Sequence, residues 1–95
     1  MAEITWTRSA LHDLKLIHQY ISEDSNYYAD RFILKLISRV DVLDKFPLSG
    51  RMVPEKEDPA IRELIEGNYR IFYKVVSQKG IFIIRIHHGA RNISK

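Results

Sequence analysis

The chain has 95 residues, a net charge of +3 and no cysteine. This length predicts one domain over residues 1–95, and the lack of cysteine excludes disulfides and thiolate metal sites. No apolar run approaches the ~20 residues of a membrane span, and the N-terminal stretch MAEITWTRSA lacks the features of a signal peptide. The composition therefore predicts a soluble cytoplasmic protein.

The first predicted elements are a short strand and a helix. Polar and β-forming residues alternate over residues 3–7, a pattern typical of a strand. Helical spacing follows, with Thr7 or Ser9 available as the N-cap, and the polar residues 22–25 are predicted to end the helix. The apolar stripe of this helix consists of Leu11, Leu14, Ile17, His18 and Ile21.

A second helix is predicted after Ser25, which can cap it. Its amphipathic stripe recurs at three- and four-residue spacing and consists of Ala29, Phe32, Ile33, Leu36, Ile37, Val40 and Leu43. The helix should end before Pro47, because the residue preceding a proline is disfavoured in the α region. Two helices joined by a short break predict an antiparallel helical hairpin.

Three strands are predicted after a loop over residues 47–59, which holds three prolines and one glycine. They cover residues 60–66, 69–77 and 81–87, with Gly67-Asn68 as a two-residue turn between the first two. The element order is β-α-α-β-β-β. This order predicts an α+β fold with a largely antiparallel sheet of about four strands and the helical hairpin on one face.

The turn lengths predict which residues share a face of this sheet. The expected cross-strand pairs are Leu64 with Ile71, Arg62 with Tyr73, Val75 with Ile84, and Phe72 with His87. The face packed on the helices would carry Leu64, Ile71, Tyr73, Val75, Phe82, Ile84 and Ile86. The opposite face, predicted to be open, would carry Glu63, Arg70, Phe72, Lys74, Arg85 and His87. A three-residue second turn would reverse the faces of the last strand.

Positive charge gathers in the last third of the chain. Residues 1–59 hold 8 Lys/Arg and 10 Asp/Glu, whereas residues 60–95 hold 7 Lys/Arg and 2 Asp/Glu. Such a region indicates an anionic partner, either nucleic acid or an acidic protein segment, or else a solvated cationic surface. One open alternative is a nucleic-acid-binding module in which Phe72 stacks on bases and the cations bind phosphates.

Two adjacent histidines end the last predicted strand. His87 and His88 point to opposite faces, so they cannot share one metal ion, and no zinc-ligand spacing accompanies them. We therefore predict no metal and no cofactor. His88 is expected to face inward as a buried, hydrogen-bonded ring, and His87 to lie on the open face. The sequence shows no Gly-rich phosphate loop and no nucleophile elbow.

Four stretches of the sequence carry a family resemblance. They are Trp6 with the following "SALHDLKLIHQYI", "FPLSGRMVPE", "RELIEGNYRIFYKV" and "IRIHHGAR". In this order they resemble the RelE/ParE superfamily of toxins from type II toxin–antitoxin modules. The resemblance covers nearly the whole chain and implies the fold predicted above.

The resemblance implies a cognate antitoxin, which wraps the toxin with its C-terminal segment, and one of two activities. RelE-like members cleave mRNA in the ribosomal A site, whereas ParE-like members inhibit DNA gyrase without nuclease chemistry. "FPLSGR" and "HHGAR" favour the ParE-like group. A member without activity of its own is a further alternative.

A RelE-like nuclease would need a base, an acid and cations for the phosphorane charge. Arg70 matches the arginine of the family's "GYR" strand motif, Arg91 matches a basic position near the C-terminus, and His87 is a candidate acid or base. The tail after Arg91 lacks the tyrosine of RelE-like nucleases, and the middle loop has few basic residues. The protein is thus an endoribonuclease if RelE-like and not an enzyme if ParE-like.

Seven residues are predicted to contact the target or the antitoxin. They are Arg62, Arg70, Phe72, Lys74, Arg85, His87 and Arg91. The predicted partners are the antitoxin and DNA gyrase, or the ribosome and mRNA in the alternative.

Overall fold

A computed structural model describes residues 2–77 and 80–89. Within these residues the elements are β1 (Glu3–Trp6), α1 (Arg8–Ser22), α2 (Asn26–Asp41), the 3₁₀ turn η1 (Val42–Asp44), β2 (Arg51–Met52), β3 (Ile61–Glu66), β4 (Tyr69–Ser77) and β5 (Gly80–His88). The described strands form one sheet in the order β1-β5-β4-β3-β2, with β1 parallel to β5 and the other pairs antiparallel. The predicted α+β class is confirmed.

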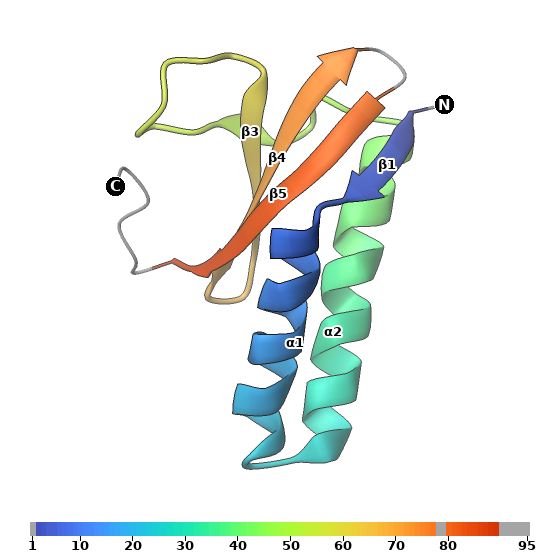
Figure 1. The fold of residues 1–95 in the computed structure, drawn as a ribbon, viewed down its shortest axis with the longest axis vertical. Coiled ribbons are helices and arrows are strands. Elements are labelled where there is room, and N and C mark those ends of the chain that lie inside the picture. Colours follow the sequence, from blue (N-terminus) through green and yellow to red (C-terminus); the bar gives the residue numbers. More distant parts are fainter. Residues whose placement is uncertain (1, 78–79, 90–95) are drawn as a thin grey trace.

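The helices lie against one face of the sheet and extend beyond it at one end (Figure 1). Thr7, one of the two N-cap candidates for the first helix, and Ser25 cap the helices, since their hydroxyl oxygens accept hydrogen bonds from the N–H groups of Ala10 and Tyr28. The sheet has five described strands instead of about four, because residues 51–52 pair with β3 inside the segment predicted as a loop. A strand of two residues is too short to give a periodic signal.

The core lies between the helical hairpin and the sheet. From α2 it takes Leu36 and Val40, both fully buried, as the stripe predicted. The stripe predicted for α1 is correct at Leu14, Ile17 and Ile21, but Leu11 is 52% exposed and Ala10 is buried in its place. His18 also lies outside the core cluster, and its Nε2 is 2.7 Å from the Asp30 carboxylate on α2.

The turn between β3 and β4 has the predicted register. Gly67 adopts φ +59°, a left-handed conformation that glycine favours, and Leu64 lies opposite Ile71. This two-residue turn therefore fixes the faces of β3 and β4 correctly.

The register of β5 against β4 differs from the prediction. The pairing shifts at two places: Phe72 pairs with Arg85 but Tyr73 with Ile83, so that Ile84 is an extra residue, and a second shift lies between Val75 and Ser77. Ile81 and Ile83 are therefore fully buried, whereas Phe82, predicted to be a core residue, is 40% exposed. The corrected core face of β5 consists of Ile81, Ile83 and Ile86.

Candidate functional site

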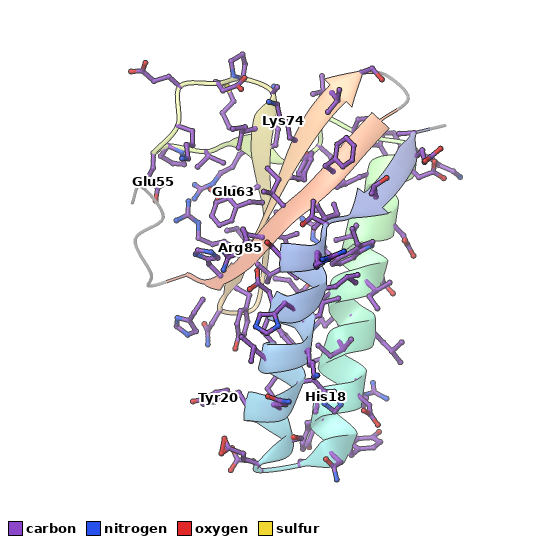
Figure 2. All side chains as sticks on the ribbon, in the orientation of Figure 1. His18, Tyr20, Glu55, Glu63, Lys74 and Arg85 are labelled. Atoms are coloured by element: carbon purple, nitrogen blue, oxygen red, sulfur yellow. The ribbon has the colours of Figure 1, made fainter. Side chains whose placement is uncertain are left out.

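The face of the sheet opposite the helices holds a cluster of arginines and carboxylates. Cross-strand pairing places Glu63 of β3 beside Phe72 of β4, and Arg70 of β4 beside His87 of β5. The segment that connects β2 to β3, residues 53–60, brings Glu55 to this face, where its carboxylate pairs with Arg70; Figure 2 labels Glu55 and Glu63. Four residues, Arg51, Glu55, Glu63 and Arg70, form what we call the Arg70 cluster.

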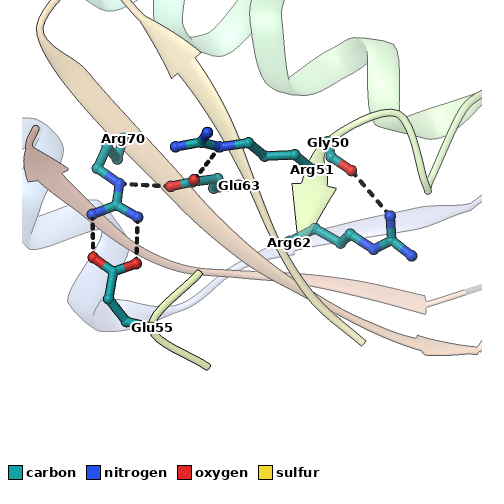
Figure 3. Close-up of polar contacts among 6 residues, drawn as sticks. All are labelled: Gly50, Arg51, Glu55, Arg62, Glu63 and Arg70. Atoms are coloured by element: carbon teal, nitrogen blue, oxygen red, sulfur yellow. Dashed lines mark hydrogen bonds and ion pairs between the residues drawn. The ribbon is translucent and has the colours of Figure 1, made fainter. Parts of the chain in front are cut away.

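Arg70 lies at the centre of the Arg70 cluster, with a side chain that is only 9% exposed. Its Nη1 and Nη2 donate hydrogen bonds of 2.8 Å each to the two carboxylate oxygens of Glu55. Its Nε donates a hydrogen bond of 2.6 Å to the fully buried carboxylate of Glu63, which also accepts one from Arg51 (Figure 3). The guanidinium is thus held by two carboxylates of the same chain.

These contacts shift the acid–base properties of the Arg70 cluster. The hydrogen bonds from Arg70 lower the pKa of the Glu55 carboxyl from 4.5 to about 2. The same bonds, together with those to Glu63, raise the pKa of the Arg70 guanidinium further above its usual value. Both groups are therefore ionised at neutral pH, and the Arg70 cluster carries two positive and two negative charges.

The lowered pKa of Glu55 predicts an acid dependence of stability. The unfolded chain binds a proton on this carboxyl below pH 4.5, but the folded protein does so only near pH 2. The contribution of Glu55 is thus complete above pH 4.5 and is lost as the pH falls to about 2. Unfolding midpoints of wild type and Glu55→Gln should differ most at neutral pH and converge in acid. A difference that stays constant over this range would contradict the pairing.

The predicted open face is therefore partly closed, contrary to expectation. Arg70 is 7% exposed and Phe72 is 4% exposed. The Arg70 guanidinium lies 4.8 Å from the centroid of the Phe72 ring, and the His87 ring meets Phe72 edge-on at 5.7 Å. Both ring nitrogens of His87 are buried. Phe72 is consequently not presented for base stacking, which removes the basis of the nucleic-acid-binding alternative.

The chain that leads into β2 and the connecting segment is held against the sheet at Gly50. The Gly50 N–H donates to the Tyr73 hydroxyl oxygen at 2.9 Å, and Arg62 donates hydrogen bonds to the carbonyls of Gly50 and Pro59. A Cβ at Gly50 would lie 2.5 Å from that hydroxyl and 2.6 Å from the Glu63 carbonyl oxygen. The chain therefore reaches the sheet here because residue 50 has no side chain.

Gly50→Ala is expected to destabilise the fold by about 1–3 kcal/mol, because the methyl group overpacks a buried contact with backbone. Gly80→Ala is a matched control, since its Cβ would meet the Ser77 Oγ at an ordinary 3.5 Å. Urea unfolding of both variants measures the difference, and equal midpoints would contradict the close approach at Gly50.

The other predicted contact residues do not join the Arg70 cluster. Arg62 lies opposite Tyr73, on the helix side of the sheet, and holds loop carbonyls. Lys74 is exposed on the face of the sheet opposite the helices. Arg85 pairs with Asp13 of α1 at 2.9 Å. Arg91 lies outside the described residues.

His88 was predicted on the correct face but with the wrong burial. It lies opposite Tyr69, on the helix side, and meets that ring edge-on at 5.5 Å. The residue is nevertheless exposed, because it ends β5 beyond the core.

Sequence reasoning missed Asp13 as a structural residue. Its carboxylate accepts hydrogen bonds from the Arg85 side chain and, at 2.8 Å, from the backbone N–H of Ile86. It thereby caps the edge of β5 beyond the point where the pairing with β1 ends at Ile83. The available signal was the position of Asp13, three residues after Ala10 and four before Ile17 on the buried stripe of α1.

Residues 2–77 and 80–89 contain no group of three or more histidines, cysteines or acids placed to hold a metal ion. No helix in these ranges is long and apolar enough to span a membrane.

Comparison with known proteins places this fold among type II toxins. A solved structure described as the chromosomal ParDE TA system from P. aeruginosa superimposes with a TM-score of 0.75 at 26% identity, covering 93% of this chain and 96% of the other. A curated protein of Caulobacter vibrioides named Toxin RelE2 is 34% identical over 91 residues, covering 96% of this chain and 99% of its own length. Both are similar to this chain along nearly its whole length.

A family model settles the membership within this class. The model for the ParE toxin of the type II toxin–antitoxin system parDE matches residues 4–93. The chain belongs to this family, within the RelE/ParE superfamily of toxins. Membership implies a cognate antitoxin as its partner.

Proposed function

We propose that this toxin inhibits DNA gyrase, as ParE-like toxins do, and is neutralised by its cognate antitoxin. The observation that carries the proposal is the state of Arg70, whose guanidinium is engaged by Glu55 and Glu63 of the same chain. An inhibitor that acts by binding needs no free catalytic arginine. The family match to a ParE toxin supports the same activity.

The geometry of the site argues against nuclease chemistry. Cleavage of RNA through its 2′-OH requires a general base, an acid and a cation for the phosphorane charge. The three nitrogens of Arg70 that donate to Glu55 and Glu63 are not presented to a phosphate. The ring nitrogens of His87 are buried, so they do not reach a substrate hydroxyl. Arg91, the third candidate, lies outside the described residues.

An mRNA interferase is the second candidate, because the Caulobacter relative carries the name RelE2. That activity would require release of Arg70 from Glu55 and exposure of the His87 ring. We expect little cleavage, since loss of one proton-transfer partner typically reduces a rate 10²–10⁴-fold.

Purified toxin incubated with programmed ribosomes tests the second candidate, with His87→Ala beside wild type. The two proteins should leave the mRNA equally intact. Rapid cleavage at A-site codons that depends on His87 would promote the interferase and remove the gyrase proposal.

A test in cells follows the topology of a reporter plasmid after toxin expression without antitoxin. We expect the plasmid to lose negative supercoiling while total mRNA remains intact. Coexpression of the product of the reading frame adjoining the toxin gene, taken as the antitoxin, should restore supercoiling. Early mRNA loss with unchanged plasmid topology would contradict the proposal.

A further inference from the structure

The pairing of Glu55 with Arg70 joins a buried cation to an anion on an irregular segment. The Glu55 side chain is 29% exposed, whereas that of Arg70 is 9% exposed and that of Glu63 fully buried. Residues 53–60 form no helix or strand, and Val53, which is 1% exposed, anchors their start. Glu55 is thus the carboxylate of the Arg70 cluster that can leave without unpacking the sheet.

The charges of the Arg70 cluster determine what Glu55 can be exchanged for. Glu63 already accepts hydrogen bonds from Arg51 and from the Nε of Arg70, so it cannot also accept hydrogen bonds from Nη1 and Nη2 of Arg70. Without Glu55 the Arg70 cluster would hold two cations and one anion. A buried guanidinium left without its partner is strongly unfavourable. Glu55 therefore leaves only when another anion takes its place.

A cavity beside Arg70 gives an incoming group access. It has a volume of about 520 Å³ and is lined by Arg51, Pro54, Glu55, Ile65, Tyr69 and Arg70, among others. The cavity opens to solvent, and the paired residues Arg70 and Glu55 both line it. A side chain from outside can thus approach the two nitrogens that Glu55 occupies.

The present occupant defines the chemistry of the ligand. Glu55 presents two carboxylate oxygens to the planar guanidinium at equal distances of 2.8 Å, so an external carboxylate fits the same position. The connecting segment also carries Lys56, Glu57 and Asp58, all exposed, so it offers no continuous positive surface for a nucleic-acid backbone. The site suits a single carboxylate on a protein segment.

We propose that Arg70 is an exchange site, at which an Asp or Glu side chain of the antitoxin displaces Glu55 and pairs with the guanidinium. This inference rests on the proposed toxin–antitoxin function. Glu55 acts as an internal competitor that keeps Arg70 neutralised in the free toxin. Antitoxin binding releases Glu55 to solvent, and the charge of Arg70 stays compensated throughout.

The exchange predicts the behaviour of Glu55 in the wild-type complex. Toxin with ¹³C-labelled glutamate, mixed with unlabelled antitoxin, allows the titration of each toxin carboxyl to be followed by NMR. The pKa of Glu55 should rise from about 2 in the free toxin towards 4.5 in the complex, because Arg70 no longer donates to it. A pKa that stays near 2 in the complex would overturn the proposal.

Substitution of the competitor gives an independent test. Glu55→Gln removes its charge and should tighten the complex about 10-fold or more, since a competitor that occupies the site lowers apparent affinity by the fraction of open sites. Glu57→Gln removes the same charge from the same segment and should change the affinity about 3-fold or less. Equal effects of the two variants would overturn the exchange, and thermal unfolding confirms that both are folded.

Binding of a short single-stranded RNA tests whether the ligand of Arg70 is a phosphate instead of a carboxylate. If Glu55→Gln gains affinity for this RNA but not for the antitoxin, the ligand is a phosphate and the proposal is wrong. Gyrase inhibition is measured in parallel and reports the proposed function separately. Tighter antitoxin binding by Glu55→Gln supports the exchange whether or not the wild-type toxin inhibits gyrase. If the toxin inhibits gyrase but Glu55→Gln does not bind the antitoxin more tightly, the exchange is wrong and the proposed function stands.

Discussion

Glu63→Ala should lower the free energy of unfolding by about 3–5 kcal/mol, the usual cost of removing one partner from a buried ion pair. The Glu63 side chain is fully buried and accepts hydrogen bonds from Arg51 and Arg70. Its removal leaves two guanidinium groups facing each other, with Glu55 pairing only one of them. Urea denaturation followed by circular dichroism measures the loss.

Glu57→Ala is the matched control for this prediction. Glu57 is an exposed carboxylate of the connecting segment, so its substitution should stay within about 0.5 kcal/mol of wild type. If Glu63→Ala is as mild as this control, Glu63 does not organise the far face of the sheet, and the Arg70 cluster loses its structural centre.

Leu36→Ala should cost about 2–5 kcal/mol, because it opens a cavity in the core between the helical hairpin and the sheet. Leu36 is fully buried on α2, in one cluster with Val40, Leu64 and Ile71. The surroundings on the sheet side are hydrogen-bonded strands, which collapse into a cavity less readily than a loop would.

Leu34→Ala makes the same chemical change two residues away. Leu34 is 63% exposed on the same helix, so the variant should lose about 0.5 kcal/mol or less. Comparable midpoints for the two leucine variants would mean that the buried face of α2 is assigned wrongly.

Local patterns were sufficient to predict most of the fold. The stripe of α2, the two capping residues Thr7 and Ser25, and the turn at Gly67 each depend on neighbours a few positions apart. The order of the elements then restricts the arrangement to a helical hairpin on one face of the sheet.

The bulge in β5 could not be predicted from alternation. Phe82, Ile83 and Ile84 are three successive apolar residues, so their sequence does not show which of them faces the core. Only the pairing with β4 and the packing under the helices decide that Ile83, rather than Ile84, faces the core. The two register shifts together therefore place Phe82, predicted in the core, on the surface.

The candidate site was predicted as separate cations rather than as ion pairs. Arg70, Phe72 and His87 were placed on the correct face, but their burial depends on Glu55, which lies 15 positions before Arg70 on a segment without periodicity. The net charge of residues 60–95 also gives no sign that Arg85 pairs with Asp13, which lies far away in the sequence. Distant pairing converts an apparently free cationic surface into a partly neutralised one.

The pairing of Arg70 gives the two candidate activities different structural requirements. An interferase must release Arg70 and expose His87 before it can act on RNA, whereas a gyrase inhibitor can bind through the surface as it stands. Lys74 and Arg51 are exposed on the sheet face opposite the helices, and they are available for contacts that need no proton transfer.

Supercoiling of relaxed plasmid by purified gyrase, with increasing amounts of purified toxin, tests the central proposal most directly. We predict that the toxin blocks supercoiling, that the antitoxin relieves the block at equal stoichiometry, and that His87→Ala inhibits as well as wild type. Full gyrase activity at saturating, folded toxin would contradict the proposal.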